Sequence, residues 1–146
     1  MPIKTFRGLI ADEGIASIPL RTNNGSTGYR IVKFELFPNE AGQQNQESTA
    51  KIYKTPQTAA TNEVDFSDQT LLAAAYYQDG TDVNQSGSMF VVFDKEVFNQ
   101  DIYITHEDTA SDQPVNYYIE LEPVKLDLNE NTVATLKDIR NIATQG

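Results

Sequence analysis

The 146-residue chain contains no cysteine, no tryptophan and a single histidine. Without cysteine there are no disulfide bonds, no thiolate metal ligands and no cysteine nucleophile. The first residues, MPIKTFRGLIADEG, place charges between their apolar pairs and lack the apolar core of a signal peptide. No run reaches the roughly 18–20 apolar residues that a membrane-spanning helix needs. We therefore expect neither a signal peptide nor a membrane span.

Positive charge is also scarce. The chain has 11 lysines and arginines against 21 aspartates and glutamates, and its formal net charge at pH 7 is −10. Proteins that bind nucleic acid normally carry a basic stripe, because neutralised phosphates supply much of the affinity. The basic residues here are scattered singly, so we predict binding neither to nucleic acid nor to an anionic membrane. Such an acidic surface suits a solvated exterior or a particle component whose free copies repel one another.

What the sequence does contain is the alternation typical of β-strands. In YRIVKFELF, the residues Val32, Phe34 and Leu36 alternate with Ile31, Lys33 and Glu35, which predicts a strand with one buried face. The run MFVVF is continuously apolar and predicts a strand that is covered on both faces. Strands are expected over residues 3–10, 15–20, 29–37, 50–54, 63–66, 89–93, 100–108 and 115–126.

Three segments refine this map. Residues 70–77, TLLAAAYY, combine alanines that favour a helix with aromatics that favour a strand, and we expect a strand or a single helical turn. The polar loop EDTASDQP separates the last two expected strands, so residues 101–126 are predicted to form a β-hairpin. Pro123 falls late in the second of these strands, which predicts a sheet edge or a β-bulge there.

Short strands at this spacing, separated by polar loops, indicate one all-β domain over residues 1–128. The predicted fold is an antiparallel jelly-roll-like sandwich. Residues 129–146 differ in kind and are predicted to form an arm with a short helix, capped by Asn131 or Thr132. Four apolar residues of this arm recur at three-residue steps: Val133, Leu136, Ile139 and Ile142.

A helix of about 12 residues is marginal by itself in water. The arm therefore has to bury its apolar side, including Leu136 and Ile139, against its own sandwich or against a neighbouring copy. Asp138 and Arg140 fall on the solvent side. Burial of three such aliphatic side chains contributes about 4–8 kcal/mol before entropy is counted, which is enough to matter for assembly.

The single histidine, His106, lies at the end of an expected strand beside Glu107 and Asp108. Such a neighbourhood suits a metal ligand or a general base. Metal-binding β-barrels of the cupin type, however, take two or three histidines from separate strands, and one histidine does not supply them. We predict instead that His106 lies at a polar loop mouth.

Oxygen ligands for calcium occur in two acidic stretches, DGTDVNQSG and HEDTASD, but neither has the spacing of an EF-hand loop. The same residue types are common in turns. The side chains concerned are Asp79, Asp82, Asn84, Glu107, Asp108 and Asp112.

Glu120 and Glu122 share one face of a strand and lie about 7 Å apart by the strand rise, which is near the carboxylate separations of glycosidases. Outward glutamates of an amphipathic strand are usually only solvated, and no tryptophan accompanies them. The tyrosine pairs 76–77 and 117–118 each place one ring on either face of a strand, so one ring is expected in the core and the other partly exposed. We predict no catalytic residue, no cofactor and no metal site.

The C-terminal run NYYIELE followed by ATLKDIRN resembles the C-terminal part of small virion proteins encoded by tailed phages of marine bacteria, cyanophages among them. The resemblance covers residues 114–142. It implies a structural protein of the phage particle, made in the bacterial host cytoplasm, and more specifically a capsid decoration or cement protein with a jelly-roll core. Such proteins commonly sit as homotrimers on the shell, contact the major capsid protein and bridge capsomers.

The interface residues that the resemblance implies are those of its motif: Leu136, Lys137, Asp138, Ile139, Arg140 and Asn141. Val133 and Ile142 extend the apolar side of the same arm. Three alternatives stay open. They are a neck or tail adaptor, a carbohydrate-binding module that uses Tyr77 and Tyr118 with calcium in the acidic loops, and a polysaccharide-degrading enzyme that uses Glu120 and Glu122.

Overall fold

The computed structural model describes residues 2–22, 25–40, 46–79 and 88–127 of the chain. Within these ranges there are eight strands and no helix, and all pairings are antiparallel. The strands are β1 (Lys4–Ile10), β2 (Gly14–Ile18), β3 (Thr27–Pro38), β4 (Gln46–Tyr53), β5 (Leu71–Asp79), β6 (Ser88–Phe93), β7 (Ile102–Asp108) and β8 (Val115–Lys125).

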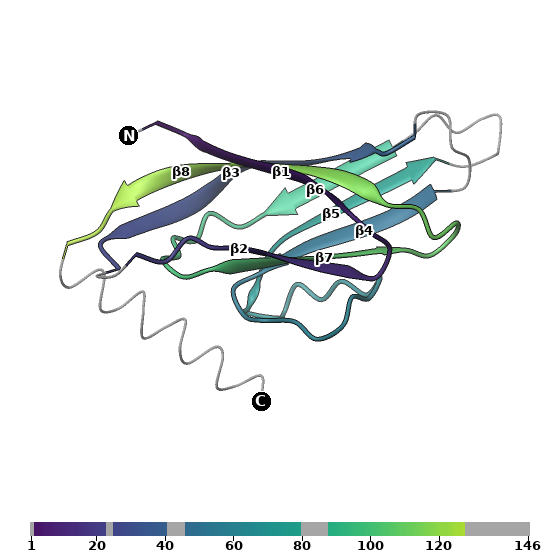
Figure 1. Cartoon of the computed structure of the whole chain (residues 1–146). Coiled ribbons are helices and arrows are strands. Elements are labelled where there is room, and N and C mark those ends of the chain that lie inside the picture. The colour runs from purple at the N-terminus through teal and green to yellow at the C-terminus, as the bar shows by residue number, and fades with distance from the viewer. Residues whose placement is uncertain (1, 23–24, 41–45, 80–87, 128–146) are drawn as a thin grey trace.

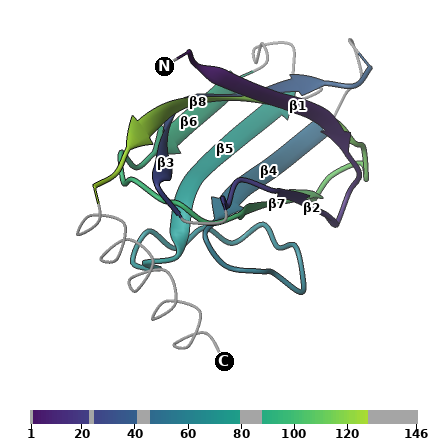
Figure 2. The ribbon, with the colours of Figure 1, turned by 60° about the vertical axis from the view of Figure 1, so that its left-hand side comes forward.

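The strands form two sheets that pack face to face (Figure 1). One has three strands in the order β1-β8-β3, and the other has five in the order β2-β7-β4-β5-β6. Figure 2 shows the two layers, with β1 and β8 in one and β4, β5 and β7 in the other. The predicted all-β sandwich is confirmed. The predicted C-terminal arm, with its contact residues from Val133 to Ile142, lies outside the described residues.

The core fills the space between the sheets and is built from alternate residues of the strands. Ile52 of β4, Ile104 of β7 and Ile119 of β8 are 0% exposed. Phe34 of β3 is 1% exposed. The strands predicted at residues 100–108 and 115–126 are confirmed as β7 and β8.

The alternation predicted for β3 is interrupted by a β-bulge. The register with β8 shifts between Ile31 and Lys33. Since a bulge adds one residue to one strand, Ile31 and Phe34 both point into the core with 1% exposure, whereas Val32 is 37% exposed. The prediction that Val32 shares the buried face was wrong, because a strict two-residue period does not register an inserted residue.

The predicted hairpin at residues 101–126 was also wrong. β7 pairs with β2 and β4 in the five-stranded sheet, whereas β8 pairs with β1 and β3 in the other sheet. The loop between them therefore crosses from one layer to the other, a step of about 10 Å. Turn-forming residues mark where a strand ends, but they do not determine which sheet receives the next strand.

Two further segments were tested. Residues 71–77 belong to strand β5, so of the two alternatives expected for residues 70–77 the strand is confirmed and the helical turn is not. Tertiary packing overrides the helix propensity of the alanines, because Ala73 and Ala75 face the core with 2% exposure each. The strand predicted at residues 63–66 is wrong. These residues lie in the loop between β4 and β5.

Among the described residues, none pairs with Pro123 on the β1 side of β8. The pairing of β1 with β8 extends only to Lys4 opposite Leu121. Tyr29, which lies opposite Pro123, exchanges its backbone hydrogen bonds with Phe98 instead of with β8. The nitrogen of Pro123 therefore points away from β3, toward an edge where no backbone hydrogen bond would form. The missing N–H of proline costs nothing there. The predicted edge position is confirmed.

Candidate interaction surface

His106 is in the core and not at a loop mouth, so that prediction was wrong. Its side chain is 0% exposed. The ring contacts Ala11 O through Nδ1 at 3.0 Å and Ser48 Oγ through Nε2 at 2.9 Å. Because a carbonyl oxygen only accepts, Nδ1 carries the proton and Nε2 accepts from the hydroxyl. The ring thus ties the turn between β1 and β2 to β4.

Burial lowers the pKa of His106, and the opposing effects of Ala11 O and of the carboxylates of Asp12 and Asp108 do not reverse that direction. The imidazole is therefore neutral at pH 7. Both of its nitrogens are used inside the core, so the ring is not available as a metal ligand or as a base toward a molecule in solution.

Asp108, at the end of β7, organises the loop that follows. Its Oδ1 accepts backbone N–H groups of Glu47 and Ala110, each at 3.0 Å. Its Oδ2 accepts the N–H of Gln113 and the hydroxyl of Ser111, each at 2.9 Å. Burial alone would raise the pKa of Asp108, but these hydrogen bonds stabilise the charged form and lower the pKa overall. The carboxylate holds the loop in place and is not poised for calcium.

Of the other predicted calcium ligands, Asp82, Asn84 and the side chain of Asp79 lie outside the described part of the structure. Glu107 alternates with Asp108 along β7 and so faces the opposite side of the sheet. Asp112 occupies a left-handed turn position with φ of 57°. In the part of the chain that the structure describes, no group of three or more histidine, aspartate or glutamate side chains is arranged to hold a metal ion.

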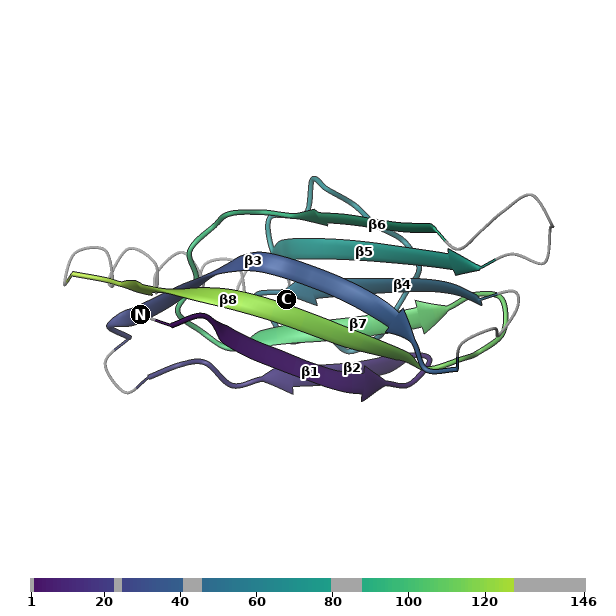
Figure 3. The same cartoon turned by 90° about the horizontal axis from the view of Figure 1, so that it is seen from above.

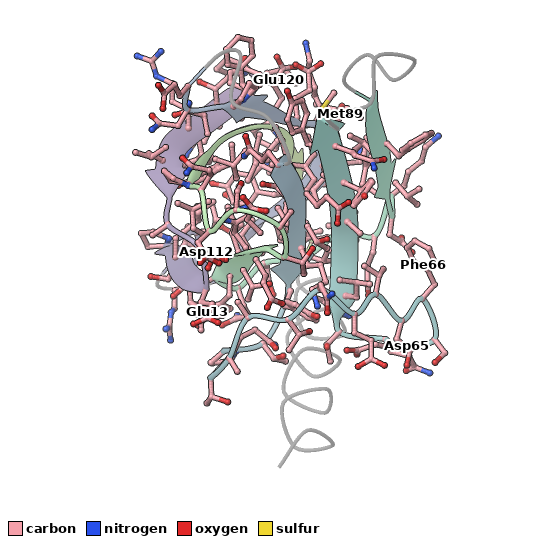
Figure 4. All side chains as sticks on the ribbon, turned by 90° about the vertical axis from the view of Figure 1, so that its right-hand side faces the viewer. Glu13, Asp65, Phe66, Met89, Asp112 and Glu120 are labelled. Carbon is pink, nitrogen blue, oxygen red and sulfur yellow. The ribbon has the colours of Figure 1, made fainter. Side chains whose placement is uncertain are left out.

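The carboxylates of Glu120 and Glu122 take part in surface contacts of β8. Glu120 accepts the hydroxyl of Tyr118 at 2.8 Å, and Glu122 pairs with Arg30 at 2.9 Å. The Arg30 guanidinium lowers the pKa of Glu122, whereas a general acid of a glycosidase needs a raised pKa. In Figure 4, Glu120 lies on the exterior of the molecule.

The tyrosine pairs divide between the faces as predicted. Tyr77 and Tyr117 pack against the core, while Tyr76 and Tyr118 lie on the outer faces of different sheets. Tyr77 thus points inward from the five-stranded sheet, whereas Tyr118 points outward from the three-stranded sheet. The two rings considered for carbohydrate binding therefore do not form one platform.

The outer face of the three-stranded sheet carries interacting charges for most of its length. Arg30 pairs with Glu122 at 2.9 Å, and Lys33 lies 3.5 Å from Glu35 and 5.8 Å from the ring centroid of Tyr118. At one end of the sheet, Leu9 and Phe37 flank Asn116 and line a hollow of about 550 Å³ together with Arg7 and Glu35. Two charged side chains therefore border even the apolar end of this face.

The outer face of β5 and β6 is different, because uncharged apolar side chains form consecutive rows across it. Ala74 lies opposite Val92, and Tyr76 lies opposite Phe90. Phe90 is 65% exposed and Val92 is 55% exposed. With Val64 and Phe66 of the β4–β5 loop, these residues line a hollow of about 540 Å³, which Glu47 of β4 borders as its one charged side chain. We call this set the β5–β6 apolar surface: Val64, Phe66, Ala74, Tyr76, Phe90 and Val92.

A buried lysine holds the β4–β5 loop against the sheet. Lys51 points out of β4 under the loop and is only 2% exposed. Its ammonium donates to Thr61 Oγ1 at 3.0 Å and to the backbone oxygen of Glu63. Burial lowers the pKa of Lys51, although nearby carboxylates, Glu107 first among them, act in the opposite direction. The loop is thereby fixed immediately before Val64.

Two aspartates shape the rest of the loop. Asp65 Oδ1 accepts the N–H of Ser67 at 2.9 Å and its hydroxyl at 2.6 Å. Asp68 Oδ1 accepts the same two groups of Thr70 at 2.9 and 2.6 Å. These turns pin the backbone on both sides of Phe66, which remains 67% exposed. Figure 4 shows Phe66 projecting from the loop at the side of the molecule.

The sequence pattern did not identify this surface. The run at residues 89–93 was predicted to be covered on both faces, which is wrong, since Met89, Phe90 and Val92 are 41%, 65% and 55% exposed. The signal was the continuous apolar run itself in a chain of mostly alternating strands. Such a run occurs both in buried strands and in strands that meet a partner, and periodicity alone does not separate the two.

No helix among the described residues is long and apolar enough to cross a membrane. Comparison of the chain with protein-family models, with curated proteins and with solved structures finds no match.

Proposed function

We propose that this chain is a non-enzymatic structural protein of a phage virion, a capsid decoration or cement protein whose copies associate and bridge neighbouring capsid subunits. The observation that carries the proposal is the β5–β6 apolar surface. Phe66, Phe90 and Val92 are each more than half exposed there and border one hollow. The resemblance of the C-terminal run to virion proteins supplies the phage context.

An apolar patch of this kind on a chain with a net charge of −10 favours an interaction surface. Contiguous exposed apolar residues on a soluble protein usually mark a site of contact, and aromatic residues are enriched there. Full burial of one such side chain contributes about 1.5–3 kcal/mol. The turns that hold Phe66 also reduce the entropy that would otherwise be lost on binding.

The strand order supports a jelly roll as the finer description of the fold. An eight-stranded jelly roll built from two Greek keys brings together the first and eighth, second and seventh, third and sixth, and fourth and fifth strands. Three of these pairs are hydrogen-bonded here: β1 with β8, β2 with β7 and β4 with β5. For the remaining pair, Tyr29 of β3 bridges to Phe98, five residues after the end of β6.

The C-terminal arm belongs to the same proposal. Its apolar residues Val133, Leu136, Ile139 and Ile142 need a surface to cover them, and the sandwich or a neighbouring copy provides one. Contacts with the major capsid protein and a homotrimeric state follow the resemblance. A neck or tail adaptor would use the same apolar surface, but it would assemble in rings of higher order around the portal.

Co-sedimentation with empty capsid shells of the encoding phage tests this function. We expect the wild-type chain to sediment with the shells and the Phe66→Asp variant to lose most of this binding. The matched control is Phe37→Asp, because Phe37 on the three-stranded sheet is 68% exposed and Phe66 in the β4–β5 loop is 67% exposed. Native mass spectrometry of the wild type gives the number of copies.

If the wild type does not bind shells, the decoration role is wrong. Equal loss of binding in both variants would place the contact elsewhere than on the β5–β6 apolar surface. A ring of twelve copies would favour the adaptor.

A further inference from the structure

The four edges of the two sheets differ in how they discourage pairing with another chain. Natural edge strands carry charges, bulges or prolines, or are kept short. β1 carries Lys4 and Arg7, β3 carries a bulge with Lys33 and Glu35, and β2 has five residues. β6, SMFVVF, has no charge and no proline, and its pairing with β5 shows no register shift. β2, GIASI, also lacks charge and proline and is one residue shorter than β6. β6 differs from it in carrying two apolar side chains that are more than half exposed, Phe90 and Val92.

The backbone of β6 presents its free hydrogen-bonding groups at known positions. The N–H of Asp94 donates to the oxygen of Leu72 in β5 at 2.8 Å. Groups alternate between the two sides of an antiparallel strand, so Phe90 and Val92 also bond to β5. The N–H and C=O groups of Met89, Val91 and Phe93 consequently point to the outer edge.

That edge is accessible in the described part of the chain. The sheet order ends at β6, and Figure 3 shows β6 at the margin of its sheet, with β3 lying over the strands next to it. β3 reaches β6 through a side chain, since the N–H of Leu36 donates to Met89 Sδ at 3.4 Å. The backbone groups at the outer edge of β6 are not used by this contact.

We propose that β6 pairs antiparallel with β6 of a second copy across a two-fold axis, with Val91 opposite Val91. This register is chosen by the backbone. It places Met89 opposite Phe93, so each outward N–H meets an outward C=O and about six hydrogen bonds form between the copies. A register centred on Phe90 would satisfy fewer of these groups.

The side chains agree with the same register. Phe90 faces Val92 of the second copy on the outer side, and the two β5–β6 apolar surfaces become one continuous stripe across the axis. Cross-strand pairs of an aromatic and a β-branched residue are favourable. No charge lies within either β6, so this edge lets two copies that each carry a net charge of −10 approach without placing like charges in direct contact.

The inference rests on the proposed function only in that both need copies of the chain to associate. It departs from the homotrimer that the resemblance implies, because a two-fold contact builds assemblies with an even number of copies. An isolated trimer would agree with a decoration protein but would contradict this pairing.

Disulfide trapping in the full-length chain tests the register, because the chain has no cysteine of its own. The variants are Phe90→Cys and Val92→Cys, both at exposed outer positions. Each is oxidised alone, and the two are oxidised as an equimolar mixture. Disulfide-linked dimers are then quantified by intact mass.

We expect the mixture to yield at least about tenfold more linked dimer than either variant alone. Residues 90 and 92 of the two copies would form a pair with Cα atoms about 4.5 Å apart, within the roughly 4.4–6.8 Å range that disulfides span. When both copies carry the same substitution, the two introduced thiols would instead belong to diagonal neighbours about 7–8 Å apart.

Equal linkage in all three samples, or most linkage in one variant alone, would overturn the register. Absence of linkage in all three, with the wild type an odd-numbered oligomer by native mass spectrometry, would overturn the pairing and leave shell binding intact. If the C-terminal arm or another protein occupies the edge instead, the wild type stays monomeric and no variant forms a linked dimer, which likewise overturns the pairing.

Discussion

The outer faces of the two sheets differ, because one is lined with charges and the other exposes apolar side chains. The three-stranded sheet carries exposed ion pairs that involve Arg30, Lys33 and Glu122. These charges keep this face solvated. On the β5–β6 apolar surface, Phe90 and Val92 are exposed without a charged neighbour on either side within β6. Alternation alone would give both sheets polar exteriors, so the apolar exterior of β5 and β6 is the surface that we propose meets a partner.

The largest expected effect comes from placing charge on the apolar face. The double variant Phe90→Asp with Val92→Asp should weaken self-association at least about 100-fold, equivalent to about 2.7 kcal/mol. Its thermal stability should stay close to that of the wild type, because both side chains are more than half exposed. Analytical ultracentrifugation over a concentration series measures the first quantity, and differential scanning calorimetry measures the second.

The other sheet offers a matched control for this variant. Leu9 and Phe37 are 55% and 68% exposed, against 55% for Val92 and 65% for Phe90. The double variant Leu9→Asp with Phe37→Asp should therefore associate like the wild type. If this control dissociates and the β6 variant does not, the contact surface belongs to the three-stranded sheet.

A smaller effect is expected from loosening the β4–β5 loop. Lys51→Met removes the two hydrogen bonds to Thr61 and Glu63 but preserves most of the apolar stem. Phe66 then loses its fixed position, and association should weaken about tenfold, equivalent to about 1.4 kcal/mol. Protease sensitivity of residues 54–70 reports the loosening directly. Faster cleavage with unchanged association would show that Phe66 does not contribute to the contact.

A fall in pH is expected to lower the stability of the protein through the buried His106 and not through either outer face. Burial lowers the pKa of His106 below the 6.5 of an unperturbed histidine, so the unfolded chain binds a proton more readily than the folded chain. The contribution of His106 to stability is complete above pH 6.5 and is lost as the pH falls toward the lower folded-state pKa. Urea unfolding between about pH 7.5 and 5 should show this decline in the wild type.

His106→Gln is the control for this pH dependence. It keeps a polar group between Ala11 and Ser48 but cannot titrate. The decline between about pH 6.5 and 5 should therefore be smaller than in the wild type. An equal decline in both chains would assign the acid sensitivity to carboxylates instead.

The smallest effect is expected on the charged face. Arg30→Gln with Glu122→Gln removes an exposed ion pair, and exposed pairs contribute little to stability. The melting temperature and the association constant should match those of the wild type within experimental error. A marked loss of association would mean that the charged face is itself a contact surface.

Much of the strand map could be read from the sequence because period-2 alternation reports which side of a strand is buried. The strands containing Phe34, Ile104 and Ile119 were predicted in this way, whereas the edge at Pro123 was predicted from the missing N–H of proline. The prediction for residues 63–66 failed because that segment is shaped by Asp65 and Asp68, whose side chains replace backbone pairing in successive turns. Local hydrogen bonds of this kind compete with strand formation.

The candidate surface was harder to predict than the fold. Phe90 and Val92 look the same in the sequence whether another element covers them or not, and only the position of β6 at the sheet margin leaves them exposed. Phe66 was expected in a strand and instead projects from a loop held by Lys51. Neither outcome follows from periodicity, because both depend on chain segments that are remote in sequence.

The sequence by itself determined that the chain is all-β and strongly acidic, since alternation and charge are properties of each short segment. The tertiary structure alone decided that His106 is buried, that β7 and β8 lie in different layers and that the uncharged strand β6 is the edge strand of its sheet. The physical reason is that backbone hydrogen bonds between strands are the same for every residue type. Which strands pair, and which apolar face stays uncovered, is settled only when all eight strands pack around one core.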